Sequence, residues 1–220
     1  MAGKTLPGAL FCWAERREEE SPVLLLVVGG AKSGKSMLAQ CLCRALAGEG
    51  GRMVYLATLD PCDGEDRQRI ARHRRDRDGW GFETLEEPYD LEKAAAALRG
   101  DEVVLLDSLT ALLGNRMFGP RPQENPVADL DRGLEVLCRR AGGVVAVTDD
   151  LFSDAAVYEG ITLRYRQLLG ELNQLAAARS QVVLESAAAM VQVHKGDGAC
   201  LPQALALFSR LTGRREGVEP

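Results

Sequence analysis

The most restrictive feature of this sequence is an apolar run that leads directly into a glycine-rich loop and then into an amphipathic helical pattern. The run Pro22–Val28 (PVLLLVV) is continuous and rich in branched residues, which is typical of a parallel strand buried on both faces. After the loop, apolar residues recur at three- and four-residue steps from Met37 to Leu46, which predicts a helix closed by Gly48–Gly51. A strand–loop–helix unit of this kind favours an α/β fold.

The same alternation continues along the chain. Short apolar runs predict further strands, and the polar or alanine-rich segments between them predict helices. The predicted strands are Met53–Ala57, Val103–Leu106, Val144–Val147 and Gln181–Glu185, with Met190–His194 as a last short strand; the predicted helices are 64–77, Leu91–Leu98, Val127–Arg140 and Thr162–Ala178; the proline-rich segment Met117–Pro126 is expected to be a long loop. This order predicts an α/β fold whose central sheet is mainly parallel and covered by helices on both faces.

Length and composition fit one such domain. The chain has 220 residues, 46% hydrophobic and 27% charged, with a formal net charge of −5. We expect residues 1–21 to form a loosely ordered N-terminal extension, 22–196 the α/β domain, and 197–220 a C-terminal extension. The acidic balance argues against a nucleic-acid partner, and no apolar run reaches the roughly 18 residues of a membrane span. Six cysteines without a CxxC pair favour reduced thiols and a cytoplasmic protein over a zinc site or disulfides.

The loop Gly29–Ser36 (GGAKSGKS) matches the phosphate-loop pattern GxxxxGK[ST] in its required strand–helix context. Its glycines let successive backbone N–H groups converge on phosphate oxygens at the helix N-terminus. The pattern assigns Lys35 to the β- and γ-phosphates of a nucleoside triphosphate and Ser36 to a magnesium ion. The residues expected to bind nucleotide here are Gly29, Gly30, Ala31, Lys32, Ser33, Gly34, Lys35, Ser36 and Met37.

Acidic residues follow two of the later buried strands. Asp107 follows the run VVLL, and Thr148-Asp149-Asp150 follows VVAV. Because ligands of open α/β sheets bind beyond the carboxyl ends of the strands, Asp107 is predicted to be a second carboxylate on the magnesium side of the nucleotide. The alternative for Asp107 is a cap or turn at the start of the next helix, and for Asp149 and Asp150 a capping role is an equal alternative.

Six arginines surround a histidine in the segment 63–77 (DGEDRQRIARHRRDR). In a helix, Asp66, Arg69, His73 and Arg77 would share one face. Guanidinium groups suit phosphate, and neighbouring positive charge disfavours protonation of the imidazole, which leaves His73 a neutral nucleophile for a nucleotide α-phosphate. The residues by themselves leave three other interpretations open: a solvated charged face, a small nucleic-acid patch, or a His73 that only binds phosphate.

Together these motifs resemble the bifunctional adenosylcobinamide kinase/adenosylcobinamide-phosphate guanylyltransferase family of cobalamin biosynthesis. The resemblance covers about residues 23–196 and rests on GGAKSGKS followed by YLAT at 55–58, RIARH at 69–73, TLEEP at 84–88 and LLDSLT at 105–110. It implies a P-loop NTPase fold of the RecA-like branch, a homotrimer, and two reactions that use one nucleotide site.

In the first implied reaction, the terminal phosphate of ATP or GTP passes to the aminopropanol hydroxyl of adenosylcobinamide. In the second, GTP guanylylates a histidine with release of pyrophosphate, and the phosphorylated corrinoid then takes up the GMP to give adenosylcobinamide-GDP. The motif match implies that His73 is the guanylylated residue, that Thr58 and Glu86 contact the nucleotide, and that Ser36 and Asp107 hold Mg²⁺.

Two of the chain's departures from the family pattern bear on the two activities. Thr148-Asp149-Asp150 stands where the family usually has TNE, so Asp149 adds negative charge near the phosphates, and Ser186–Met190 replaces a turn with a proline. Two alternative functions therefore stay open at this point: a P-loop kinase that has kept phosphorylation only, and a nucleotide-binding regulatory protein whose catalysis has decayed.

Overall fold

The computed structural model describes residues 23–153 and 156–213, without the side chains of Glu65 and Arg69. Its centre is a seven-stranded sheet in the order β3-β2-β4-β5-β1-β6-β7. The strands are β1 Leu24–Gly29, β2 Met53–Ala57, β3 Phe82–Glu86, β4 Val103–Asp107, β5 Gly143–Asp149, β6 Val182–Ala187 and β7 Met190–Lys195. Every neighbouring pair is parallel except β6 and β7, so the mainly parallel α/β fold is confirmed.

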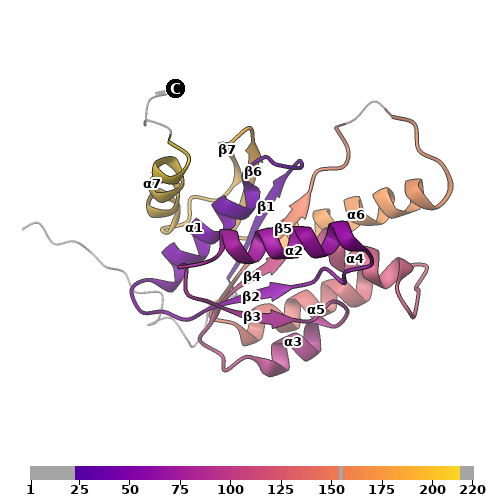
Figure 1. Ribbon diagram of the computed structural model, residues 1–220, viewed down its shortest axis with the longest axis horizontal. Coiled ribbons are helices and arrows are strands. Elements are labelled where there is room, and N and C mark those ends of the chain that lie inside the picture. Colours follow the sequence, from indigo (N-terminus) through magenta and orange to yellow (C-terminus); the bar gives the residue numbers. More distant parts are fainter. Residues whose placement is uncertain (1–22, 154–155, 214–220) are drawn as a thin grey trace, which may run out of the picture.

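Helices cover both faces of the sheet (Figure 1). They are α1 Lys35–Ala47, α2 Gly64–Asp76, α3 Leu91–Ala97, α4 Leu109–Phe118, α5 Val127–Arg140, α6 Gly160–Arg179 and α7 Leu201–Leu211. Side chains alternate along each strand: on β1, Leu25 and Val27 pack with α1 and α7, whereas Leu24 and Leu26 pack with α3, α4, α5 and α6. None of these helices is both long and apolar enough to cross a membrane.

The strand order brings the predicted site residues to one edge of the sheet. Strand β5 lies between β1, which leads into the glycine-rich loop, and β4, which ends at Asp107. In register, Asp107 lies opposite Val147, and Gly29 lies opposite Asp149. The carboxyl ends of β4, β5 and β1 therefore face the same region of solvent.

Three elements of the structure are not among those that the sequence predicts. Strand β3 has mostly exposed side chains and lacks an apolar run, because it lies at the edge of the sheet beside β2. Helix α4 continues to Phe118, so the predicted loop from Met117 is shorter at its start. Helix α7 lies within residues 197–220, where we expect an extension, yet its Leu201, Ala204 and Phe208 are buried in the same core as α1. The expected extension at 1–21 lies outside the described residues.

A buried carboxylate fixes the turn that leads into β4. Glu102 accepts hydrogen bonds from the backbone N–H groups of Arg99 at 3.0 Å, Gly100 at 2.8 Å and Asp101 at 3.2 Å. Burial by itself would raise the pKa of Glu102, but these hydrogen bonds outweigh it and hold the pKa below its usual range. A carboxyl group with a lowered folded-state pKa stabilises the fold above its unfolded pKa of about 4.3, and this stabilisation is lost as the pH falls through the lowered value.

We therefore expect Glu102→Gln to lower the free energy of unfolding at pH 7 by about 1–3 kcal/mol, since the amide is a weaker acceptor and brings a donor among donors. The difference from the unmodified protein should shrink at acidic pH, where Glu102 itself becomes protonated. Urea unfolding at pH 7 and below pH 4 measures both effects. The exposed Glu124 provides the control Glu124→Gln, which should unfold like the unmodified protein. An equal loss at both pH values would contradict the prediction.

Candidate nucleotide and histidine site

The phosphate loop has the backbone shape that its pattern predicts. Strand β1 ends at Gly29, and α1 begins at Lys35 after Gly34, whose φ of 98° is in the left-handed region. A Cβ at Gly29 would lie 2.5 Å from the carbonyl oxygen of Ser186, so only glycine fits at that position. The Ser33 hydroxyl is buried and has no hydrogen-bond partner among the described residues. Because buried polar groups are normally hydrogen-bonded, this hydroxyl is available to a ligand bound in the loop.

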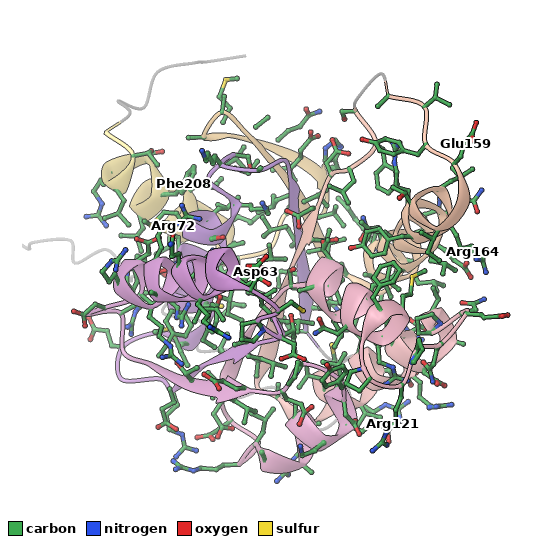
Figure 2. All side chains as sticks on the ribbon, turned by 45° about the vertical axis from the view of Figure 1, so that its right-hand side comes forward. Asp63, Arg72, Arg121, Glu159, Arg164 and Phe208 are labelled. Atoms are coloured by element: carbon green, nitrogen blue, oxygen red, sulfur yellow. The ribbon has the colours of Figure 1, made fainter. Side chains whose placement is uncertain are left out.

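The β6–β7 hairpin supports the loop from one side. The Ser186 hydroxyl and the Ala189 backbone N–H both donate to the carbonyl oxygen of Ser33, each at 2.9 Å. The turn places Ala188 and Ala189 at φ values of 48° and 58°, a conformation that is costly for alanine. The departure at Ser186–Met190 is therefore a strained turn in contact with the phosphate loop. Phe208 of α7, which Figure 2 labels, lies next to the hairpin at the same place: a Cβ at Gly34 would lie 3.4 Å from the Phe208 ring and 3.5 Å from the Ser186 hydroxyl.

The Lys35 ammonium is held by two oxygen atoms at the mouth of the loop. Its Nζ donates to the carbonyl oxygen of Gly30 at 3.0 Å and lies 2.8 Å from a carboxylate oxygen of Asp149. The backbone N–H of Asp149 donates to the Thr110 hydroxyl, which fixes the end of β5. The position at which this chain departs from the family pattern thus places a carboxylate against the predicted phosphate-binding lysine. The side chains of Lys35 and Asp149 are only 12% and 17% exposed.

We expect Asp149→Asn to tighten the binding of ATP or GTP about 5- to 10-fold. The substitution removes a negative charge that repels the phosphates and competes with them for Lys35, and a tenfold change corresponds to about 1.4 kcal/mol. Titration calorimetry with a non-hydrolysable triphosphate measures the dissociation constant. The neighbouring Asp150→Asn, which removes the same charge from a residue that caps the 150–153 turn, serves as the control. Weaker binding by Asp149→Asn would contradict the prediction and would assign this carboxylate to the metal.

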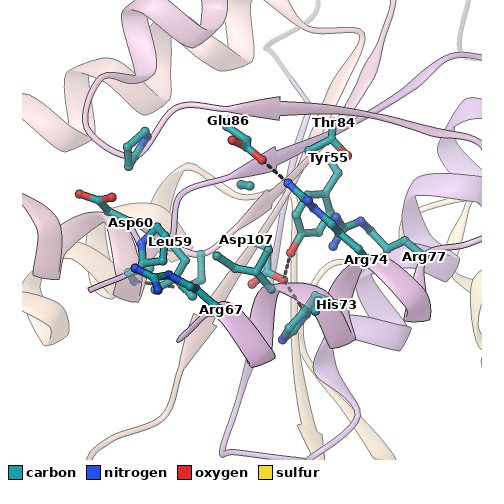
Figure 3. Close-up of a pocket in the computed structure, with 17 residues that line it drawn as sticks. Tyr55, Leu59, Asp60, Arg67, His73, Arg74, Arg77, Thr84, Glu86 and Asp107 are labelled. Carbon is teal, nitrogen blue, oxygen red and sulfur yellow. Dashed lines mark hydrogen bonds and ion pairs between the residues drawn. The ribbon is translucent and has the colours of Figure 1, made fainter. Parts of the chain in front are cut away.

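His73 lies in a cavity of about 550 Å³ between α2 and the carboxyl ends of β2, β3 and β4 (Figure 3). Its Nδ1 is 3.7 Å from Oδ2 of Asp107, and the same oxygen accepts a hydrogen bond of 2.7 Å from the Tyr55 hydroxyl. Ser108, not Asp107, caps α4, because its side chain accepts from the Ala111 N–H. The capping alternative for Asp107 is therefore wrong, and its carboxylate faces the cavity together with the imidazole.

Helix α2 contributes arginines to this cavity but packs little against the sheet. Asp63 caps the helix and Arg72 lies further along it (Figure 2), and none of its described side chains is buried. Arg67 and Arg74 line the cavity with His73, and Arg74 pairs with Glu86 at 2.6 Å. The prediction that Asp66, Arg69, His73 and Arg77 share one face of the helix is therefore only partly correct. His73 and Arg77 do line the cavity, but the Asp66 carboxylate accepts from the Cys62 N–H outside it, and the Arg69 side chain is outside the description.

Arg77, which follows α2, is the buried cation of the cavity. Its residue is 8% exposed, its guanidinium carbon lies 3.3 Å from the centre of the Tyr55 ring, and burial lowers its pKa. Its Nη1 is buried and has no hydrogen-bond partner among the described residues. A buried guanidinium nitrogen without an acceptor favours an anionic ligand in this cavity.

Thr58 is predicted to contact the nucleotide, but its hydroxyl is used within the protein. Thr58 is fully buried, donates to the Ser108 carbonyl at 2.8 Å and accepts from the Ser108 N–H at 2.7 Å. Nearby, the Asn115 amide donates to the carbonyl oxygens of Thr58 and Pro88, at 2.6 and 2.7 Å. These contacts join the ends of β2, β3 and β4 at the rim of the cavity. Of the two residues predicted from YLAT and TLEEP, Glu86 lines the cavity and Thr58 does not.

The phosphate loop and the histidine cavity are neighbouring but separate. No residue of 29–36 lines the cavity, and β5 lies between β4 and β1. Since adjacent strands are about 4.8 Å apart, the two groups of residues are separated by roughly 10 Å along the edge of the sheet. A triphosphate held by the loop therefore has to extend along this edge, or α2 has to approach it, before His73 reaches an α-phosphate.

A glycine loop of this geometry, at the carboxyl edge of a parallel sheet and followed by a helix, defines a P-loop nucleotide-binding protein. The chain can also be assigned to one family within this class. The chain belongs to the cobinamide kinase / cobinamide phosphate guanyltransferase family, whose model matches residues 25–192.

Individual relatives agree with this membership. The bifunctional adenosylcobalamin biosynthesis protein CobP of Pseudomonas aeruginosa is 34% identical over 78% of this chain and 97% of its own length. The bifunctional adenosylcobalamin biosynthesis protein CobU of Escherichia coli is 30% identical over 74% of this chain and 94% of its own length. Among solved structures, the flagellar accessory protein FlaH of Methanocaldococcus jannaschii aligns over 80% of both chains with a TM-score of 0.46 and 11% identity.

Proposed function

We propose that this protein phosphorylates adenosylcobinamide with ATP or GTP and then transfers GMP from GTP to the product through a guanylyl-histidine at His73, which gives adenosylcobinamide-GDP. Membership of the family supports both activities. The observation that carries the second activity is the position of His73 beside Asp107, at the sheet edge that also holds the phosphate loop.

For phosphorylation, the groups needed are those of the phosphate loop. The backbone N–H groups after Gly30 and the N-terminus of α1 would surround the β- and γ-phosphates. Lys35 would exchange its contact with Asp149 for the γ-phosphate, where its charge offsets the negative charge of the transferring group. The corrinoid hydroxyl would approach from the solvent side of the sheet edge.

The donor set at this edge fits a magnesium ion that is shared with the nucleotide. Among the described residues, no group of three or more histidine, cysteine or acidic side chains could hold a metal alone. Magnesium is typically bound by one or two protein oxygens plus substrate phosphates, and the Ser36 hydroxyl and the Asp107 carboxylate are such oxygens. When bound, Mg²⁺ would neutralise charge on the phosphates; Ser36 would hold it from the loop, and Asp107 would hold it from the end of β4, across β5.

For guanylyl transfer, the cavity supplies a nucleophile and cations. His73 provides a ring nitrogen, Asp107 orients the ring, and the arginines Arg67, Arg74 and Arg77 face the space in which a nucleotide phosphate would lie. The arginines attract the phosphate. The volume of about 550 Å³ is in the range of ordinary ligand sites.

Two assays test the proposed function against the alternatives. The protein is incubated with adenosylcobinamide and ATP, and separately with GTP labelled at the α-phosphate. We expect phosphorylated corrinoid in the first assay and an acid-labile, alkali-stable label on the protein in the second. Phosphorylation without protein label would support a kinase that has lost guanylyl transfer. Nucleotide binding without either product would support a regulatory protein.

The assembly and the compartment are also proposals. Exposed apolar side chains gather before and within the first turns of α6, including Phe152 at 43%, Val157 at 90% and Ile161 at 61% exposed. Such a patch favours contact with further copies of the chain, and the resemblance implies three copies. Light scattering of the purified protein measures the mass. Buried free thiols at Cys41, Cys43, Cys138 and Cys200 favour the reducing cytoplasm.

A further inference from the structure

Tyr55, the first residue of the YLAT segment, makes a contact to which neither the motif nor the proposed function assigns a role. Its hydroxyl donates to Oδ2 of Asp107 at 2.7 Å, and this is the carboxylate oxygen that faces Nδ1 of His73 at 3.7 Å (Figure 3). A phenol and an imidazole thus converge on one oxygen atom. Because Tyr55 lies on β2 and Asp107 on the adjacent β4, in a register that places Tyr55 opposite Leu105, the contact joins two neighbouring strand ends.

The Tyr55 ring is itself fixed on both sides. Tyr55 is 5% exposed, the Arg77 guanidinium stacks on its face, and the Phe82 ring packs edge-on with centres 6.4 Å apart. A ring packed in this way has little rotational freedom, so its hydroxyl keeps a constant direction. A donor held in one direction restricts the carboxylate that accepts from it.

We propose that Tyr55 is a positioning residue for guanylyl transfer: through its hydrogen bond to Asp107 it holds the carboxylate against Nδ1 of His73, so that Nε2 is the atom that bonds to phosphorus. This inference rests on the proposed function. It gives the tyrosine of YLAT a role, and it adds a tautomer and a reacting nitrogen that the motif match does not specify. The observed distance of 3.7 Å is longer than a hydrogen bond, and a small rotation of the ring would close it; a carboxylate bonded to Nδ1 then fixes the proton on that nitrogen and leaves Nε2 to react, as in other histidine–carboxylate pairs.

The step balances without a further reactant. The lone pair of Nε2 attacks the α-phosphorus of GTP, the N–P bond forms, and the bond from the α-phosphorus to the bridging oxygen breaks, so that pyrophosphate leaves with that electron pair. The proton stays on Nδ1. The imidazole gains a positive charge as the bond forms, and the Asp107 carboxylate 3.7 Å away stabilises that charge. In the second step the corrinoid phosphate oxygen attacks the same phosphorus and the N–P bond breaks. Its electron pair returns to Nε2, which restores the neutral ring.

The variant Tyr55→Phe removes one hydroxyl and keeps the ring that stacks on Arg77. We expect the rate of protein labelling at saturating labelled GTP to fall about 10- to 100-fold, which is the usual effect of losing a partner that orients a histidine ligand or base. The GTP concentration for half-maximal labelling and the rate of adenosylcobinamide phosphorylation should stay within about twofold, since neither depends on the orientation of His73 and Tyr55→Phe leaves in place the charge of Asp107 that would hold Mg²⁺. A general structural defect would lower both rates together.

Two further variants complete the test. The control Tyr165→Phe removes a tyrosine hydroxyl on the opposite face of the sheet, where it donates to the carbonyl oxygen of Thr110. This variant should be labelled at the normal rate. In an Asp107→Asn background, Tyr55→Phe should cause no further loss of labelling, because the two residues act as one unit. If the unmodified protein is labelled and Tyr55→Phe is labelled equally fast, the inference is wrong and the proposed function stands. If the unmodified protein is not labelled, the proposed function itself fails.

Discussion

His73→Asn is expected to abolish the covalent guanylylation of the protein, with a loss of at least about 10³-fold in labelling by GTP. Asparagine has no nucleophilic ring nitrogen, so the N–P bond cannot form, and removal of a covalent nucleophile causes the largest losses known in enzyme variants. The side chain of His73 is 25% exposed and lies beside a cavity, so the smaller asparagine should not disturb folding. Formation of adenosylcobinamide-GDP should stop while adenosylcobinamide phosphorylation continues at a rate within about threefold of the unmodified protein.

The second histidine in the chain supplies the matched control. His194 lies on the edge strand β7 and pairs with Glu185 at 2.8 Å, away from the cavity. His194→Asn should therefore be labelled like the unmodified protein. Residual label on His73→Asn at the normal level would show that another residue carries the nucleotide, and loss of label on His194→Asn alone would move the covalent site to the opposite edge of the sheet.

Lys35→Ala is expected to lower the rate of adenosylcobinamide phosphorylation by about 10²- to 10³-fold or more. The substitution removes the cation that would stabilise the transferring phosphoryl group, and a single well-placed electrostatic contact is worth this much in rate. Asp149, which lies 2.8 Å from the Lys35 ammonium, would then face the phosphates without its partner and add repulsion. Initial rates with ATP and with GTP, measured at saturating corrinoid, give the effect.

The same variant asks whether one nucleotide site serves both reactions. If GTP for guanylylation is also held by the phosphate loop, Lys35→Ala should lose protein labelling together with phosphorylation. Retained labelling would contradict the shared site and assign GTP to the histidine cavity, which none of the residues 29–36 lines. Lys93→Ala is the control, because that exposed lysine on α3 pairs with Glu87 outside both sites.

The sequence predicts the parts of the molecule whose signals are local. Each buried parallel strand is a short apolar run next to glycine or an acidic residue, and the phosphate loop is a contiguous pattern with a defined backbone shape. Asp107 is predictable because ligands bind beyond the carboxyl ends of such strands. His73 is predictable only as the centre of an arginine cluster, and its place beside Asp107 follows from the fold.

The features that the sequence does not predict depend on contacts between distant segments. Strand β3 carries few apolar residues because only one neighbour, β2, pairs with it. The apolar pattern of the strand assigns no special role to Tyr55, because its hydroxyl finds a partner only when β4 places Asp107 beside it. For Thr58 the motif implies a contact with the nucleotide, but the fold uses its hydroxyl for two hydrogen bonds to the backbone of Ser108, 50 positions later in the chain.

The contacts around Ser33 and Gly34 show that residues 186–208 help to shape the phosphate loop. A carbonyl of the phosphate loop accepts hydrogen bonds from a hairpin that follows it by about 150 residues, and Phe208 of α7 lies beside the same part of the loop. Shortening the protein at residue 196 would remove Phe208 and leave the hairpin alone in contact with Gly34. The backbone that receives the triphosphate is thus completed by segments synthesised about 150 residues or more after the loop itself, so a ribosome-bound chain would acquire its full nucleotide affinity only after those segments have emerged.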